Sequence, residues 1–219
     1  MSFLNQLKFQ ASVAQQESST NLAELQANIR VTESAARVVW SYISELSKQL
    51  AIISPTGPAL AIDTKKPWPA MKLVDFRYDA RKKKIQEPGL SQEVYDYVAM
   101  GWRSVPREGS PLSESVNVNF PPELERVQNR LTAGNVKYER LEVRHPEKGT
   151  LQAYRFQYTT EARSSITITM HHAKAELVFR LVGLQGFGVQ TVTYPAHQVS
   201  NDLMDELAKL IVGQASRFG

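Results

Sequence analysis

The chain has no cysteine among its 219 residues. A zero count excludes disulfides, thiolate nucleophiles, and zinc or iron–sulfur sites held by cysteine. No apolar run reaches the roughly 18 residues of a transmembrane helix, so none is expected. Residues 1–8 lack the order of a signal peptide, in which a basic region precedes an apolar one. These absences favour a cytoplasmic location.

Motifs that specify a reaction are also lacking. Gly186 and Gly188 form a Gly-x-Gly sequence without the third glycine or the following helix of a dinucleotide-binding loop. The adjacent His171 and His172 are expected in an exposed turn without a ligand, because successive strand residues point to opposite faces. We therefore expect no metal and no cofactor. Enzymatic activity is the least favoured class, although a site assembled from distant residues stays open.

The strongest pattern that is present is a heptad near the N-terminus. Its a and d positions over residues 22–53 are apolar except at Thr32, and this spacing predicts one long helix with a continuous apolar seam. The seam residues are Leu22, Leu25, Ile29, Ala36, Val39, Ile43, Leu46 and Leu50. The polar stretch 15–20 is expected to interrupt any earlier helix, and Ser54-Pro55 is expected to end this one.

Two alternatives follow for what covers the seam. The e and g positions are nearly uncharged, whereas a two-stranded coiled coil usually carries complementary charges there. Trp40 and Tyr42 also widen the apolar face. The helix therefore packs either on the sheet of its own chain or against other helices in an oligomer, and the sequence favours neither.

The rest of the chain predicts an α+β domain. Apolar residues make up 42% of the chain, enough for a packed core. A proline-rich linker is expected over 55–70, and alternation of apolar and polar residues marks strands through 71–194. The expected order is βββ-α-βββββ, with residues 136–194 forming a five-stranded meander.

These strands predict one curved antiparallel sheet of about eight strands within a domain over 71–219. A C-terminal helix is expected to pack on one face of that sheet, and the long helical segment 1–54 precedes the domain. Over roughly residues 70–215 this element order resembles that of helix-grip ligand carriers, although the long N-terminal helix departs from it. The resemblance implies a cavity between the sheet and the C-terminal helix.

Two groups of side chains are candidate binding sites. The first is a basic run, which could contact phosphates of nucleic acid or anionic lipid, with a nearby tryptophan for stacking. The alternative interpretation is a solvated strand end. It consists of Arg81, Lys82, Lys83 and Lys84, together with Trp68.

The second group consists of aromatic strand residues. It could line a pocket for a small apolar ligand, or it could belong to the core of the sheet. Its members are Tyr95, Tyr97, Trp102, Tyr154, Phe156 and Tyr158.

Three functional hypotheses result. The first is a non-enzymatic interaction or assembly protein that self-associates or docks on a protein partner through its N-terminal helix. The alternative is a small-molecule or lipid-binding module with an aromatic pocket between sheet and C-terminal helix. A further alternative is a nucleic-acid-associated protein that uses the basic run at 81–84.

Overall fold

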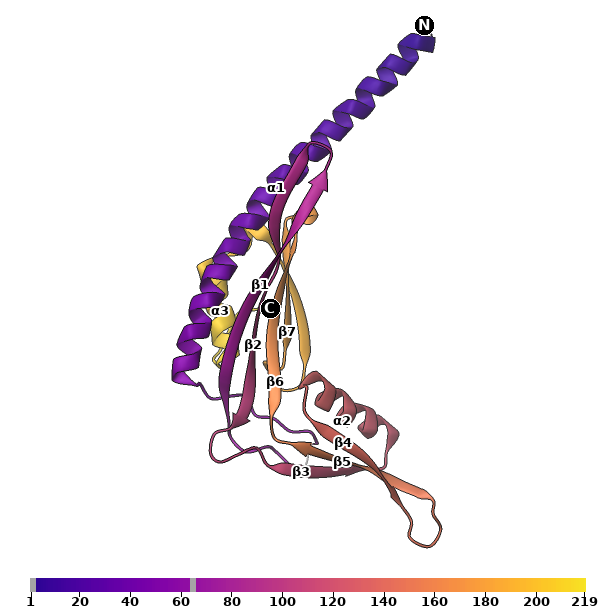
Figure 1. The fold of residues 1–219 in the computed structure, drawn as a ribbon, viewed down its shortest axis with the longest axis vertical. Helices are drawn as coiled ribbons and strands as arrows, with labels where there is room; N and C mark the ends of the chain where they lie inside the picture. The colour runs from indigo at the N-terminus through magenta and orange to yellow at the C-terminus, as the bar shows by residue number, and fades with distance from the viewer. Residues whose placement is uncertain (1–2, 64–65) are drawn as a thin grey trace.

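The computed structural model describes residues 3–63 and 66–219 and confirms the α+β class (Figure 1). A long helix comes first, eight antiparallel strands follow, and a helix closes the chain. In chain order the elements are α1 (Phe3–Ile53), β1 (Met71–Glu87), β2 (Leu90–Pro106), β3 (Ser113–Val118), α2 (Pro121–Ala133), β4 (Tyr138–Arg144), β5 (Leu151–Thr159), β6 (Ala162–His171), η1 (His172–Lys174), β7 (Glu176–Val182), β8 (Val189–Pro195), η2 (Ala196–Gln198) and α3 (Asn201–Ile211).

The eight strands form two sheets where the sequence predicts one. The larger sheet has the order β1-β2-β6-β7-β8, and the smaller has the order β3-β5-β4. The five-stranded meander predicted over 136–194 is therefore wrong, because β5 pairs with β3 and β4 in the smaller sheet, while β6 pairs with β2 in the larger one. Alternation along a strand identifies its buried face, but it does not identify the neighbouring strand.

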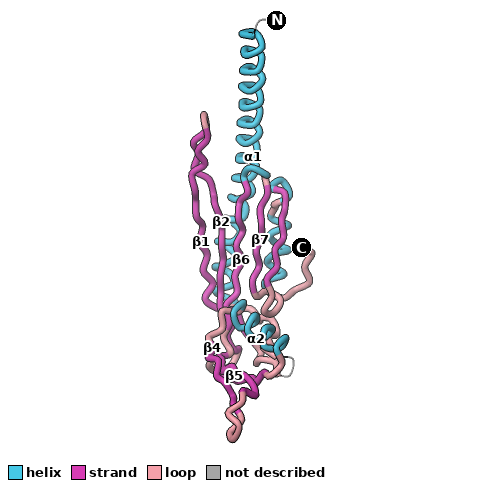
Figure 2. The backbone as a smooth tube through the Cα atoms, turned by 90° about the vertical axis from the view of Figure 1, so that its right-hand side faces the viewer, coloured by secondary structure: helices cyan, strands magenta, loops and turns pink. Residues whose placement is uncertain are grey.

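Helices α1 and α3 cover the same face of the five-stranded sheet (Figures 1 and 2). The larger core lies between these two helices and the sheet, and side chains of β2, β6 and β7 belong to it together with side chains of α1 and α3. Thr32, the one polar residue of the seam, is fully buried, and its hydroxyl donates to the Asn28 carbonyl oxygen at 2.8 Å. The heptad positions from Ile29 to Leu50 are therefore buried except Leu46, which is half-buried.

Helix α1 begins at Phe3, so the start predicted at Asn21 is wrong. The polar stretch 15–20 contains neither glycine nor proline, so no residue in it interrupts the backbone hydrogen bonds of the helix. The end at Ile53 is confirmed, and Ser54 follows it with a φ of 44° before Pro55. At about 1.5 Å per residue the helix is roughly 77 Å long, which is longer than the sheet that it covers (Figure 1).

A smaller core joins α2 to the three-stranded sheet. Val127 and Leu131 of α2 pack with Phe156 of β5. The proline-rich stretch 55–70 adds Leu60, Ile62 and Trp68 to this core, and the Trp68 amide donates to the Leu60 carbonyl at 2.8 Å. This stretch therefore packs against the body as part of its interior.

Candidate functional site

The central part of the predicted helix interface is covered by the chain's own sheet and by α3. Ile29, Ala36, Val39, Ile43 and Leu50 are buried, whereas the seam's remaining members are half-buried. Those remaining members are Leu22, Leu25 and Leu46. Between Ile29 and Leu50 the seam therefore packs on the sheet of its own chain, which is the first of the two alternatives.

A hydrogen bond also joins α1 to α3 at the edge of this contact. The Tyr42 hydroxyl donates to Asp205 Oδ1 at 2.5 Å. Burial raises the pKa of Tyr42 far above its usual value, and the bond to Asp205 raises it further. Tyr42 therefore stays a neutral donor that holds the two helices together.

The predicted aromatic pocket is not formed, because the two sheets separate its members. Tyr95, Tyr97 and Trp102 belong to β2 of the larger sheet. The other three aromatics, Tyr154, Phe156 and Tyr158, lie on β5 of the smaller sheet.

The space between the larger sheet and α3 is occupied by core side chains. Phe179, Met204, Leu207 and Phe218 are all buried there. The cavity that the helix-grip resemblance implies is therefore filled by the protein itself.

The basic run is largely neutralised by carboxylates of the neighbouring strand. Lys82 pairs with Glu93 at 3.4 Å, and Lys83 pairs with Asp96 at 2.8 Å. Arg81 also approaches Asp96, at 3.9 Å, so Lys84 is the member that forms no ion pair among the described residues.

Trp68 does not belong to this surface, and its predicted stacking role is wrong. The side chain is only 7% exposed, and its ring stacks on Tyr158 in the smaller core. A buried indole is not accessible to the bases of a nucleic acid, so the predicted phosphate site loses its aromatic member.

A buried carboxylate and a buried imidazole connect α1 to the sheet. Glu33 Oε1 accepts from the Tyr95 amide at 2.8 Å and lies 3.1 Å from His172 Nε2. His172 is 4% exposed, so the exposed turn predicted for the histidine pair is wrong for this residue, although His171 is exposed. Burial lowers the pKa of His172, and its hydrogen bond to the Glu33 carboxylate opposes that shift.

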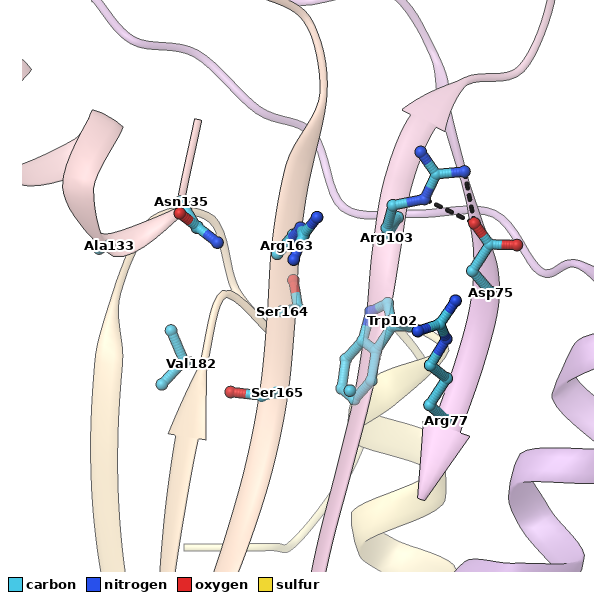
Figure 3. A pocket seen from close by; sticks show the side chains of 11 residues that line it. Asp75, Arg77, Trp102, Arg103, Ala133, Asn135, Arg163, Ser164, Ser165 and Val182 are labelled. Carbon is cyan, nitrogen blue, oxygen red and sulfur yellow. Dashed lines mark hydrogen bonds and ion pairs between the residues drawn. The ribbon is translucent and has the colours of Figure 1, made fainter. Parts of the chain in front are cut away.

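The face of the larger sheet opposite α1 and α3 carries a cleft of about 610 Å³ (Figure 3). Its lining comes from β1, β2 and β6, from the last residue of β7, and from the end of α2 and the turn that follows it. The Arg163 amide donates to the Gly134 carbonyl at 2.7 Å and so holds the α2 end against β6. We call this feature the arginine cleft, because Arg77, Arg103 and Arg163 line it together.

The three arginines differ in their partners. Arg103 forms ion pairs with Asp75 and with Glu161, the latter at 2.9 Å, and hydrogen bonds to these carboxylates raise its pKa. The side chains of Arg77 and Arg163 form no hydrogen bond or ion pair among the described residues. The cleft therefore presents two cationic side chains whose charge no carboxylate neutralises.

Sequence reasoning missed this cleft because its arginines are far apart in the chain. Arg77 alternates with apolar residues on the polar side of a predicted strand, which is a usable signal. Nothing in the sequence, however, shows that β1, β2 and β6 are neighbours. A consecutive run such as 81–84 is visible in the sequence, and a cluster assembled by strand pairing is not.

The N-terminal part of α1 extends beyond the body of the molecule (Figures 1 and 2). We call residues 3–20 the projecting segment. Phe3, Leu7 and Val13 are exposed there, at 74%, 45% and 39%. The projecting segment therefore exposes large apolar side chains on a part of α1 that extends past the sheet.

Within residues 3–63 and 66–219, no three histidine, aspartate or glutamate side chains lie close enough together to hold a metal ion. No helix in these ranges is both long and apolar enough to cross a membrane. Compared with known proteins, the chain matches no family, no curated protein and no solved structure at a significant level.

Proposed function

We propose that this chain is a non-enzymatic assembly protein that self-associates through the projecting segment of α1. The observation that carries the proposal is a helix that continues for about five turns past its own body with apolar side chains exposed. The absence of cysteine supports a cytoplasmic setting for this assembly.

The projecting segment lacks the features that stabilise a helix on its own. Most helical stability in proteins comes from packing of an apolar face, and isolated helices of this length are marginal in water. Ser18, Ser19 and Thr20 are weak helix formers in sequence. A helix of this composition is expected to persist when another surface covers it.

The low charge of the projecting segment favours a second copy of this chain as the surface that covers it. Residues 3–20 carry one basic residue, Lys8, and one acidic residue, Glu17. A segment without net charge offers no electrostatic attraction to nucleic acid or to an anionic membrane. In a symmetric dimer the same patch is used twice, so Phe3 and Leu7 of each copy would meet apolar side chains of the other.

The experiment is light scattering coupled to size exclusion over a range of protein concentrations. The full chain is expected to form a dimer or a larger symmetric oligomer. Replacing Phe3 and Leu7 with glutamine retains good helix formers and should shift the association to about tenfold higher concentration or more.

The matched control is the double substitution of Ile52 and Ile53 by glutamine at the opposite end of the same helix. These side chains are 77% and 63% exposed, so the change in apolar surface is similar. Association of this variant should equal that of the original chain. A monomer at all concentrations, or an equal effect of the two double substitutions, would overturn the proposal.

A further inference from the structure

We infer that the arginine cleft is a binding site for a small organic phosphate, with the phosphoryl group held between Arg77 and Arg163. This inference rests on the geometry of the uncovered sheet face and is independent of self-association through α1. It concerns a face of the sheet that neither α1 nor α3 covers (Figure 2).

Strand pairing brings the arginines to one place from three strands. Arg77 of β1 lies opposite Gly101 of β2, and Gly101 lies opposite Ser165 of β6. In the adjoining part of the same ladder, Arg103 lies opposite Arg163. Two strand spacings separate β1 from β6 by roughly 10 Å, a distance that two long guanidinium side chains can close around one anion.

The balance of charge in the cleft favours an anion. Like charges directly opposite each other on neighbouring strands are destabilising, and Arg103 and Arg163 form such a pair. Asp75 and Glu161 both pair with Arg103, so the three arginines and these two carboxylates leave a net charge of +1. Arg77 and Arg163 remain, and the two charges of a phosphate monoester match them, since guanidinium groups bind phosphate oxygens in a bidentate manner.

The floor of the cleft provides space and neutral donors. Gly101 has no side chain, and a Cβ built there would come no closer than 3.7 Å to another atom, the Ser164 carbonyl oxygen. The Ser165 hydroxyl and the Asn135 side-chain amide form no hydrogen bond among the described residues, so both are free to donate to phosphate oxygens.

The size and the remaining lining indicate an organic group on the phosphate. At about 610 Å³ the cleft is in the range of small-molecule sites and exceeds the volume of an inorganic anion. Val182 adds apolar surface on the side away from β1 (Figure 3). The organic part of the ligand is therefore expected to lie against Val182, between β7 and the end of α2.

The test is titration of the full chain with phenyl phosphate, followed by isothermal calorimetry and by the phosphorus NMR signal. We expect a dissociation constant below about 1 mM. Arg77→Gln and Arg163→Gln should each weaken binding by about tenfold or more, because each removes a charged hydrogen-bond donor. Gly101→Leu should weaken it similarly while keeping every charge, because it fills the floor.

The control is Arg180→Gln, which removes an exposed arginine from β7 on the same sheet face outside the cleft. Binding by this variant should be unchanged, and all four variants should retain the original melting temperature, because the substituted positions lie outside both cores. Absence of binding at millimolar phenyl phosphate would overturn the inference. Equal losses with Arg180→Gln, or tenfold tighter binding of malonate, a dicarboxylate, would also overturn it.

Discussion

The two parts of α1 have the same backbone and different surroundings. From Ile29 to Leu50 the seam is buried beneath the sheet and α3, whereas residues 3–20 extend past the body with apolar side chains exposed. The difference teaches that one continuous helix can be buried along only part of its length, because burial of its apolar side chains depends on where the sheet ends. The tip of the β1–β2 hairpin marks the boundary, since Gly89 lies there against Leu22.

Deleting the buried or the projecting part of α1 tests this comparison, and the first deletion is expected to have the largest effect on stability. Removing residues 1–54 should leave a chain that does not fold, because the lost core side chains contribute more than the roughly 5–15 kcal/mol by which a native domain is stable. Removing residues 1–20 should leave the melting temperature of dilute protein nearly unchanged. Circular dichroism and thermal melts distinguish the two outcomes. A folded, cooperative chain that lacks residues 1–54 would show that α1 is dispensable to the core.

Single substitutions test the same contrast at two points. Ile43→Ala removes a fully buried side chain and should destabilise the protein by about 2–5 kcal/mol. Leu7→Ala changes an exposed side chain and should stay within about 0.5 kcal/mol. Urea unfolding of dilute protein measures both. Similar losses for the two variants would mean that the projecting segment is packed in solution.

Burial of His172 where α1 meets the sheet should make the stability of the fold sensitive to acid. Burial lowers the pKa of His172 from its ordinary 6.5, so the unfolded chain takes up this proton first as the pH falls. The stability should therefore be complete above about pH 7 and decline as the pH falls through 6.5 toward the lowered value. Urea unfolding at about pH 7.5 and 5.5 measures the decline.

A matched pair of substitutions tests whether His172 causes this loss of stability at low pH. His172→Gln should reduce the difference in unfolding free energy between the two pH values, because it removes the buried imidazole. His171→Gln changes the exposed neighbour and should leave the difference as it is in the original chain. If all three proteins lose the same stability between the two pH values, His172 does not cause the decline.

The smallest effect is expected at the boundary itself. Gly89 has a φ of +81°, a conformation that costs other residues about 1–2 kcal/mol, so Gly89→Ala should destabilise the protein by about that amount. Gly188→Ala is the control, because its φ is ordinary and no atom lies within 4 Å of a Cβ built there. Equal unfolding free energies for these two variants would show that the hairpin tip tolerates a side chain.

The expectations that succeeded were local ones. Heptad spacing located the seam, Ser54-Pro55 located its end, and alternation located the eight strands. The prediction that fails along α1 is a helix break at residues 15–20. Polar residues disfavour burial, but a stretch without glycine or proline does not interrupt a helix.

The candidate sites show the same division between local and distant information. The run Arg81–Lys84 was visible in the sequence, but Glu93 and Asp96 of the next strand neutralise most of it. The predicted aromatic set was divided between two sheets. The arginine cleft was invisible, since its members are brought together only by the β1-β2-β6 order.

The sequence by itself determined the α+β class, the long helix and the alternation of its strands, because these depend on residues within a few turns or strand steps of one another. The tertiary structure decided which strands share a sheet, what covers the seam, that His172 is buried against Glu33, and that three distant arginines line one cleft. These outcomes depend on contacts between residues far apart in the chain. Which residues meet is determined by how the whole core packs.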